Sequence, residues 1–124
     1  MASSPAYAKY PDHCVKVEPK PGRLRVDFAG ETIAESGRSL LCLEGTYDPV
    51  FYVPRADVRS EFLQKTEHTT YCPFKGHASY YTIRVGDRVS ENALWSYENP
   101  YDQVASLKDC AAFYRERVDA LVAE

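Results

Sequence analysis

The sequence predicts a mainly β protein, built as a compact, single-domain antiparallel sheet or small barrel with short helical pieces. Leu24, Val26 and Phe28 alternate with polar residues, which is the period-two pattern of a half-buried strand. Ten of the 124 residues are tyrosines. Tyrosine favours strands because its ring packs against neighbours while its hydroxyl group reaches water. The length suits one domain with one sizeable core.

The first 22 residues contain four prolines. Because proline removes a backbone donor and fixes φ, we expect an extended N-terminal arm over residues 1–22 with little regular structure. A single β-rich domain is expected over residues 23–124. It begins with a predicted hairpin, whose strands at 24–28 and 32–35 flank the turn at 29–31.

The middle of the chain alternates between strand patterns and turn residues. A helical turn is expected at 55–58, because Pro54 suits the start of a helix. The run 78–85 is the strongest strand pattern, and Gly86–Asp87 after it is typical of a hairpin turn. Strands are expected at 40–44, 50–53, 78–85, 88–90 and 93–97.

The C-terminal tail admits two interpretations. No proline or glycine follows Gln103, and apolar residues recur on one helical face. This pattern predicts a helix over roughly residues 107–123. A strand at Ala111–Tyr114 is the alternative. The residues on the helical face are Leu107, Cys110, Ala111, Tyr114, Val118, Leu121 and Val122.

The charge pattern argues against nucleic-acid binding. The net charge is -3 and no two basic residues are adjacent, whereas a phosphate backbone attracts a concentrated positive patch. No apolar run is long enough to span a membrane. The first residues lack the charged and apolar regions of a secretory signal. We therefore expect a cytoplasmic protein that binds neither nucleic acid nor a membrane.

The four cysteines are Cys14, Cys42, Cys72 and Cys110, and none belongs to a C-x-x-C pair. Structural zinc sites usually take their ligands in close pairs, so we expect no metal site. Disulfides are rare in cytosolic proteins, and Cys42 and Cys110 are expected to be small buried apolar residues. The sequence points to no particular cofactor.

The segment Cys72–Pro73–Phe74–Lys75–Gly76 is the strongest candidate for chemistry. It places a thiol three residues before an ammonium group, and a nearby cation favours the reactive thiolate. Lys75 could instead hold a phosphate or carboxylate as a point charge. Gly76 would let a backbone approach a ligand closely. A structural turn, with Cys72 buried and Lys75 in water, is the alternative.

Other polar groups could join this segment. Glu44 ends a predicted strand, and we predict it as a third catalytic group beside Cys72 and Lys75. His77 could act as a base or as an ion-pair partner, and a surface histidine without a functional role is the alternative. Asp57 also stands near an element end, where a capping or solvated role is the alternative.

Aromatic side chains are expected to line a ligand site. Their alternative role is core packing or cross-strand pairing. Because side chains alternate along a strand, Tyr80 and Tyr81 should lie on opposite faces and Trp95 and Tyr97 on one face. The predicted ligand-binding residues are Tyr52, Gly76, Tyr80, Trp95 and Tyr97.

Taken together, these segments resemble a known family, domain-of-unknown-function family number 427, which also carries a nucleotidyltransferase-like label. The resemblance covers roughly residues 23–120 and implies a compact, mainly β domain, which favours the strand at 111–114. It implies motif residues without assigning their roles: Glu44, Tyr52, Cys72, Lys75, Gly76, Trp95 and Tyr97. It rests on Glu44, Phe51–Pro54 with Asp57–Val58, Thr70 with Cys72–Gly76, Ala78–Tyr81, Trp95–Tyr97 with Pro100, and Phe113–Tyr114 with Val118.

These features favour a small-molecule-binding domain with a site at the C-P-F-K-G segment, and they do not decide whether it is an enzyme. A non-catalytic protein-interaction module is the alternative and predicts an exposed aromatic patch or a free sheet edge. A nucleotidyltransferase, as the family label suggests, is a second alternative. Such enzymes hold a metal with paired acids, and no close acid pair stands beside a Gly-rich loop here. The sequence predicts no oligomeric state.

Overall fold

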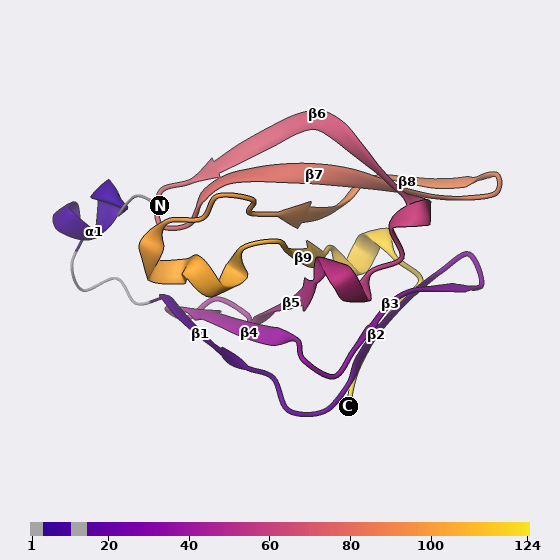
Figure 1. Cartoon of the computed structure of the whole chain (residues 1–124), viewed down its shortest axis with the longest axis horizontal. Helices are drawn as coiled ribbons and strands as arrows, with labels where there is room; N and C mark the ends of the chain where they lie inside the picture. Colours follow the sequence, from indigo (N-terminus) through magenta and orange to yellow (C-terminus); the bar gives the residue numbers. More distant parts are fainter. Residues whose placement is uncertain (1–3, 11–14) are drawn as a thin grey trace.

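The computed structural model describes residues 4–10 and 15–124 and is mainly β, as predicted (Figure 1). Its helical elements are α1 (Pro5–Lys9) and the 3-10 turns η1 (Arg55–Asp57), η2 (Ser60–Phe62), η3 (Asp102–Leu107) and η4 (Arg115–Arg117). Its strands are β1 (Val15–Pro19), β2 (Leu24–Phe28), β3 (Glu31–Ser36), β4 (Leu40–Glu44), β5 (Val50–Pro54), β6 (Leu63–Cys72), β7 (Gly76–Val85), β8 (Arg88–Ser96), β9 (Cys110–Phe113) and β10 (Ala120–Ala123).

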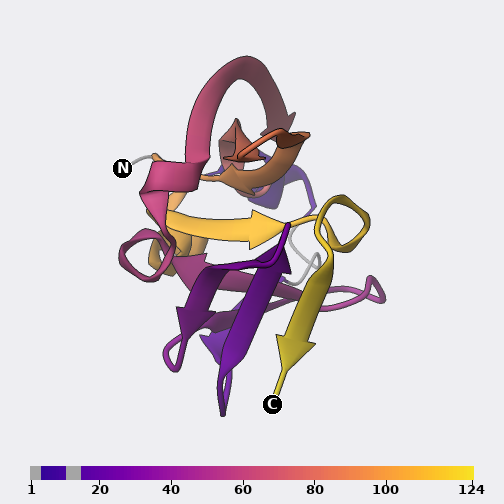
Figure 2. The same cartoon turned by 90° about the vertical axis from the view of Figure 1, so that its right-hand side faces the viewer.

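The described strands form two antiparallel sheets. Seven strands make the large sheet, in the order β1-β4-β5-β9-β8-β7-β6, and three make the small sheet, β10-β2-β3. Figure 2 shows β9 of the large sheet running across the direction of the strands in the small sheet. The edge strands β1 and β6 do not pair with each other. The predicted antiparallel sheet is therefore confirmed, and the alternative of a small closed barrel is wrong.

The small sheet contains the predicted hairpin, β2 and β3. Leu24, Val26 and Phe28 are buried, as the alternation predicted. Ala29 and Gly30 at the turn both have positive φ, of 53° and 79°. Two such residues are typical of the tight turns that match the twist of paired strands, and glycine adopts this conformation without strain.

The next predicted elements are also confirmed. The runs 40–44 and 50–53 form β4 and β5, which pair antiparallel. Pro54 ends β5 and precedes the 3-10 turn η1, where a helical turn was expected. The fixed φ of proline suits this position.

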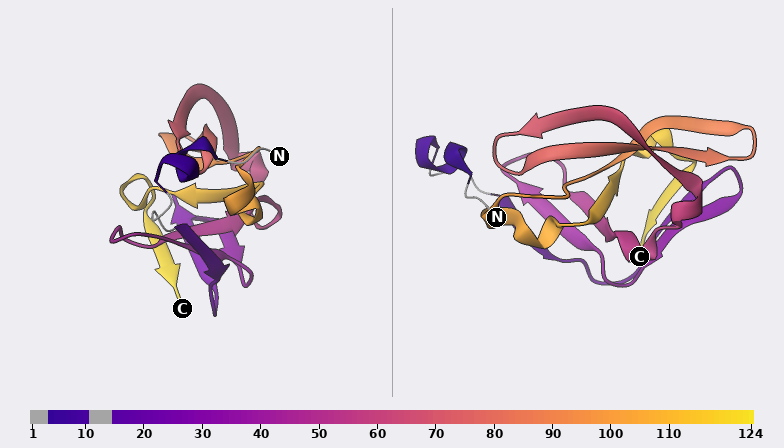
Figure 3. Two further views of the ribbon diagram at one scale, coloured as in Figure 1. Left: turned by 90° about the vertical axis from the view of Figure 1, so that its left-hand side faces the viewer. Right: turned by 45° about the horizontal axis from the view of Figure 1, so that its top comes forward.

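The hairpins of β6, β7 and β8 make the long arm of the large sheet. The predicted strand at 78–85 lies within β7, whereas the two strands predicted at 88–90 and 93–97 form one continuous strand, β8. Strand β6 was not predicted, because it is an edge strand whose largely exposed side chains show no apolar alternation. Figure 3 shows it bowing away from β7 between its two ends.

The helix predicted over residues 107–123 is wrong. This segment forms β9, the turn η4 and β10, and the alternative strand at 111–114 is confirmed in β9. All four residues of β9 are buried, because this strand lies between β5 and β8. Its continuous apolar run is typical of a strand covered on both faces. Strand β10 pairs with β2, a distant partner that no local pattern can show.

The expectation of little regular structure in the N-terminal arm is wrong where the structure describes it. Pro5 opens α1, where its missing N–H costs no hydrogen bond, and the Ser4 side chain caps this helix. Pro19 ends β1, an edge strand that pairs with β4. Edge strands tolerate proline because one side needs no partner. Cys14 lies outside the described residues.

Two groups of apolar side chains lie on opposite faces of the large sheet. Tyr81 belongs to the first group with the small sheet, and Tyr80 belongs to the second, which confirms the predicted alternation. Strands β5 and β9 also send alternate residues into each group, such as Val53 and Tyr52. We call the second group the concave core; its buried members are Cys42, Tyr52, Ala78, Tyr80, Tyr97, Val104, Leu107, Cys110 and Ala112.

Replacing Leu94 with alanine should lower the free energy of unfolding by about 3 kcal/mol, because the change leaves a cavity in a packed core. Leu94 is 0% exposed on β8. On the same strand Val89 is 41% exposed, and Val89→Ala should change the unfolding free energy by less than about 0.5 kcal/mol. Urea unfolding measures both. Equal effects would contradict the burial pattern of β8.

Candidate functional site

The C-P-F-K-G segment forms the turn between β6 and β7. The amide of Lys75 donates to the carbonyl of Cys72 at 3.2 Å and closes the turn. Gly76 has φ of 116°, and a Cβ atom there would approach the carbonyl oxygen of Asn99 to 3.3 Å. This conformation and this contact both favour glycine. The carbonyl of Lys75 accepts from the amide of Tyr101 at 2.9 Å, so the turn is fastened on both sides.

Lys75 does not extend into water. Only 8% of this residue is exposed, and its Nζ donates a hydrogen bond to Oε1 of Glu44 at the end of β4. The Sγ atom of Cys72 lies 4.0 Å from the same Nζ. The structure therefore brings together the three predicted catalytic residues: a thiol, an ammonium group and a carboxylate. The alternative of Lys75 in water is wrong.

The surroundings of Lys75 shift the pKa of its ammonium group in opposite directions. Burial alone lowers the pKa of its ammonium group, but the hydrogen bond to Glu44 and the nearby Cys72 and Glu44 outweigh burial, so the pKa of Lys75 is raised. Lys75 therefore stays charged. An ammonium group that stays charged can hold an anionic group of a ligand as a point charge.

A second thiol belongs to this environment. Cys42 is buried as predicted, and burial raises its pKa while the charge of Lys75 opposes that rise. Cys42 was predicted only as a buried apolar residue, without a place near the Lys75 turn. The sequence contains a signal for this position of Cys42. Cys42 and Glu44 are two residues apart on one strand and so face the same side. Of the three described cysteines, Cys72 is the one that is partly exposed.

The predicted ligand-binding aromatics lie in or against the concave core. Tyr52 is 2% exposed and Tyr97 is 6% exposed, and their ring centroids are 6.4 Å apart. The hydroxyl oxygen of Tyr52 accepts from Nε1 of Trp95 at 3.3 Å. Burial raises the pKa of both tyrosines. Their packing matches the alternative role of core residues, and ligand contact by these rings stays a prediction.

Tyr80 is directed toward a different set of partners. Its hydroxyl group is 3.0 Å from Oγ1 of Thr70 and 3.4 Å from the hydroxyl group of Tyr114. The imidazole of His68 lies against its ring, with centroids 4.5 Å apart. Tyr80 thus contacts side chains of β6 and Tyr114, which follows β9, rather than the Lys75 turn.

Two further polar candidates have other partners. His77 is exposed and its ring packs against Tyr71, with centroids 4.8 Å apart. Asp57 accepts hydrogen bonds from Arg38 and from Ser36, and these bonds lower its pKa. Asp57 therefore forms an ion pair with Arg38, which is neither the capping nor the solvated role that was its alternative interpretation.

The described residues also set limits on metals and membranes. Within residues 4–10 and 15–124, no three His, Cys, Asp or Glu side chains gather in a group that could hold a metal ion. No helix among these residues has the length and apolar character needed to cross a membrane.

Comparison with known families identifies the chain. A family model described as Domain of unknown function (DUF427) matches residues 16–124. The chain belongs to this family. The match includes nearly all of β1 and the whole of β10, beyond the roughly 23–120 expected from the sequence motifs. A comparison with curated proteins gives no match.

Removing one partner of the Lys75–Glu44 pair should destabilise this DUF427 domain. Lys75→Met should lower the free energy of unfolding by about 3 kcal/mol, because the Glu44 carboxylate is left in a poorly hydrated place. Combining Lys75→Met with Glu44→Leu should restore much of the loss. Urea unfolding of the two single variants and the double variant measures this coupling.

The exposed Lys65–Glu98 pair provides the control. Its side chains are 53% and 40% exposed, so Lys65→Met should cost less than about 1 kcal/mol. If Lys75→Met and Lys65→Met lowered the free energy of unfolding equally, the burial of the Lys75 pair would make no difference to stability.

Stability should fall at alkaline pH. The raised pKa of Lys75 means that its ion pair contributes fully below the unfolded pKa of about 10.5 and is lost as pH rises through the folded value. Tyr52 also lowers stability as pH rises. Its hydroxyl group keeps its proton in the folded protein, whereas the unfolded chain releases that proton above about pH 10. Urea unfolding from about pH 8 to pH 11 measures this loss. Tyr52→Phe should lose less stability over that range, and an unchanged slope would contradict the role of Tyr52.

Proposed function

We propose that this DUF427 domain binds a small molecule at Cys72, Lys75 and Glu44. The observation that carries the proposal is the nearly buried ammonium group of Lys75, bonded to Glu44 and 4.0 Å from the Cys72 thiol. A buried ion pair is weak evidence for stability alone, because desolvation offsets much of its attraction. Charged groups gathered beside a nucleophile are typical of functional sites.

Cys72, Lys75 and Glu44 each have a separate role in such a site. Cys72 is the accessible thiol, and Lys75 provides a fixed positive charge for a thiolate or for an anionic part of the ligand. Glu44 holds the ammonium group in place and can accept a proton.

The concave core supports the turn from behind. Tyr52, Tyr97 and Trp95 pack in or against the same apolar group as Cys72. In this proposal they form the rigid aromatic wall of the site, and Gly76 keeps the turn close to residues 99–101.

A protein-interaction role has one specific observation in its favour. Tyr71 is 47% exposed, and its hydroxyl group is 2.7 Å from that of Tyr101. Its ring also contacts His77, so three flat side chains form an exposed patch beside the turn. Exposed aromatic groups of this kind are common in interfaces.

A nucleotidyltransferase has a separate requirement. It must bind a nucleoside triphosphate together with a metal ion. Calorimetric titration with magnesium and each nucleoside triphosphate tests this alternative, and heat that depends on Lys75 would favour it over the general proposal.

A thermal-shift screen against metabolites tests the proposed site. A true ligand at about a hundredfold excess over its dissociation constant adds about 2.7 kcal/mol, which should raise the melting temperature by about 5–10 °C. The shift should disappear in Cys72→Ser and Lys75→Ala. It should persist in Lys65→Ala, which removes an exposed lysine of the same hairpin.

Two results would count against the proposal. A ligand whose shift survives both Cys72→Ser and Lys75→Ala would bind elsewhere. A broad screen with no shift in the wild type would favour the interaction role of the Tyr71 patch.

A further inference from the structure

The N-terminal segment of residues 4–10 packs against the turn that carries Cys72 and Lys75. Figure 1 shows α1 at the end of the molecule where β6 and β7 are joined. The segment precedes residue 16, where the match to the DUF427 family model begins. It therefore lies outside the matched domain and yet contacts the position of the proposed site.

The attachment depends on one buried hydroxyl group. Ser4 is 4% exposed, and its Oγ donates to the carbonyl oxygen of Pro73 at 2.5 Å. The amide of Ser4 donates to Oε1 of Gln103 in η3, at 3.1 Å. Ser4 thus connects the turn to η3, next to the bond that the Tyr101 amide donates to the carbonyl of Lys75.

The same hydroxyl group caps the helix α1. The amide of Ala6 donates to Oγ of Ser4 at 3.2 Å. A helix of five residues is not stable by itself, because nucleation of a helix is unfavourable. Since the oxygen that caps α1 is also the one bonded to Pro73, the helix and the attachment should form together. The segment then has two states, attached and helical or detached and unfolded.

A ring contact provides the second attachment. The ring centroids of Tyr10 and Phe74 are 6.5 Å apart, with their planes inclined by 58°. Phe74 and Pro73 are the two residues between Cys72 and Lys75. Tyr10 is 54% exposed, so this end of the segment is held weakly. The segment therefore contacts the middle of the turn through few interactions.

Segments held by few and partly exposed contacts detach locally at a small cost in free energy. Without Ser4, the carbonyl of Pro73 loses this donor. The turn then keeps the bond between Lys75 and Tyr101 and its own closing bond, from the Lys75 amide to the carbonyl of Cys72. Cys72 is partly exposed and directly precedes Pro73, so a looser turn gives reagents more access to its thiol.

We propose that residues 4–10 form a strap that regulates the Cys72–Lys75 site. The attached strap holds the turn rigid and limits access to the thiol, and the detached strap releases both. This inference rests on the proposed function only in taking Cys72 and Lys75 as the site. The strap itself is defined by the contacts of Ser4 and Tyr10.

Two substitutions of Ser4 separate the attachment from the helix cap. Ser4→Ala removes both the donor to Pro73 and the cap. Ser4→Asp keeps an oxygen that caps a helix, but its ionised carboxylate has no proton to donate and would face a carbonyl oxygen. If the bond to Pro73 holds the strap, both variants should detach it.

Hydrogen exchange at single amides, followed by NMR, measures the looseness of the turn. The amide of Lys75 should exchange about tenfold faster in Ser4→Ala and Ser4→Asp, since the loss of a hydrogen bond with a local cap or charge effect costs about that factor. The amide of Ile83, in the buried core on β7, should keep its exchange rate, because detachment is local. Urea unfolding checks that each variant is folded.

Alkylation by iodoacetamide measures access to the thiol. Mass spectrometry of the digested protein follows Cys72 separately from the three other cysteines, Cys14, Cys42 and Cys110. The rate at Cys72 should rise in the same two Ser4 variants in which the Lys75 amide exchanges faster.

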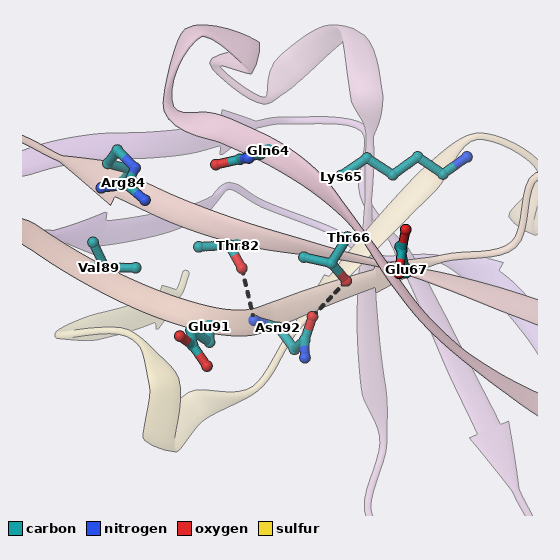
Figure 4. Close-up of a pocket in the computed structure, with 9 residues that line it drawn as sticks. All are labelled: Gln64, Lys65, Thr66, Glu67, Thr82, Arg84, Val89, Glu91 and Asn92. Atoms are coloured by element: carbon teal, nitrogen blue, oxygen red, sulfur yellow. Dashed lines mark hydrogen bonds between the residues drawn. The ribbon is translucent and has the colours of Figure 1, made fainter.

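Thr66→Val provides the matched control on the strand that leads to Cys72. Oγ1 of Thr66 donates to Oδ1 of Asn92 at 2.7 Å, away from the turn (Figure 4). Valine keeps the shape of threonine and removes this hydroxyl group. Both rates at the turn should stay at their wild-type values. If Thr66→Val raised them as much as Ser4→Asp, the strap would have no specific effect.

Three results would overturn the proposal. Unchanged exchange of the Lys75 amide in both Ser4 variants would show that the strap does not hold the turn. Faster exchange with unchanged alkylation would show that it does not limit access to Cys72. A wild-type rate in Ser4→Asp beside a raised rate in Ser4→Ala would assign the effect to the helix cap instead of the bond to Pro73.

Neither measurement uses a ligand. A metabolite screen without a hit would therefore count against the proposed function and leave the strap standing. Failure of the strap would in turn leave the proposed binding site untouched, so the two proposals are tested separately.

Discussion

The charge of Lys75 must be balanced inside the protein, and this need constrains the shape of the large sheet. Glu44 provides the balancing charge from the end of β4, and three strands separate β4 from β7 in the sheet order. The two side chains can meet only if the sheet bends so that distant strands approach across its concave face. An unpaired buried charge would cost several kcal/mol, whereas the pair offsets much of that cost. The Lys75–Glu44 ion pair thus connects distant strands of the bent sheet, which does not close into a barrel.

The space enclosed by this bend is filled by the concave core. Tyr52, Tyr97 and Cys42 pack there, close to the charged turn, and the opposite face of the same strands packs on the small sheet. Strands covered on both faces leave little freedom for movement, because protein interiors are densely packed. A turn fastened to such a scaffold keeps its thiol and ammonium group in fixed positions, which is what a binding or catalytic site requires.

The arm of β6, β7 and β8 has a different design. Two bulges interrupt the regular ladder on either side of β7, and Thr66 and Asn92 bond across them. The irregular pairing places Asn92 in the lining of a cavity that it shares with Tyr114 and the η4 residues Glu116 and Arg117. The domain therefore presents polar side chains at two places, one made by a tight turn and one made by irregular strands.

Local sequence patterns were sufficient to predict strands whose side chains are alternately buried and exposed, and hairpins whose turns contain typical turn residues. The hairpin of β2 and β3 and the strand β7 could be predicted in this way, because alternate burial leaves a period of two in the sequence. The exposed edge strand β6 has no such pattern. The apolar spacing of the tail fits a helical face and so predicts a helix. In the structure β9 lies between β5 and β8, and β10 pairs with β2.

The sequence by itself determined the mainly β class, the family and the turn that places Cys72 near Lys75, since these depend on residue type and short spacing. Only the tertiary structure decided that Lys75 is buried and that its partner is Glu44, 31 residues away. It alone decided that the hydroxyl group of Tyr80 lies beside Thr70 and Tyr114, while that of Tyr52 accepts a hydrogen bond from Trp95. The physical reason is that pairing across a bent sheet depends on strand order and bulges, which are properties of the whole chain.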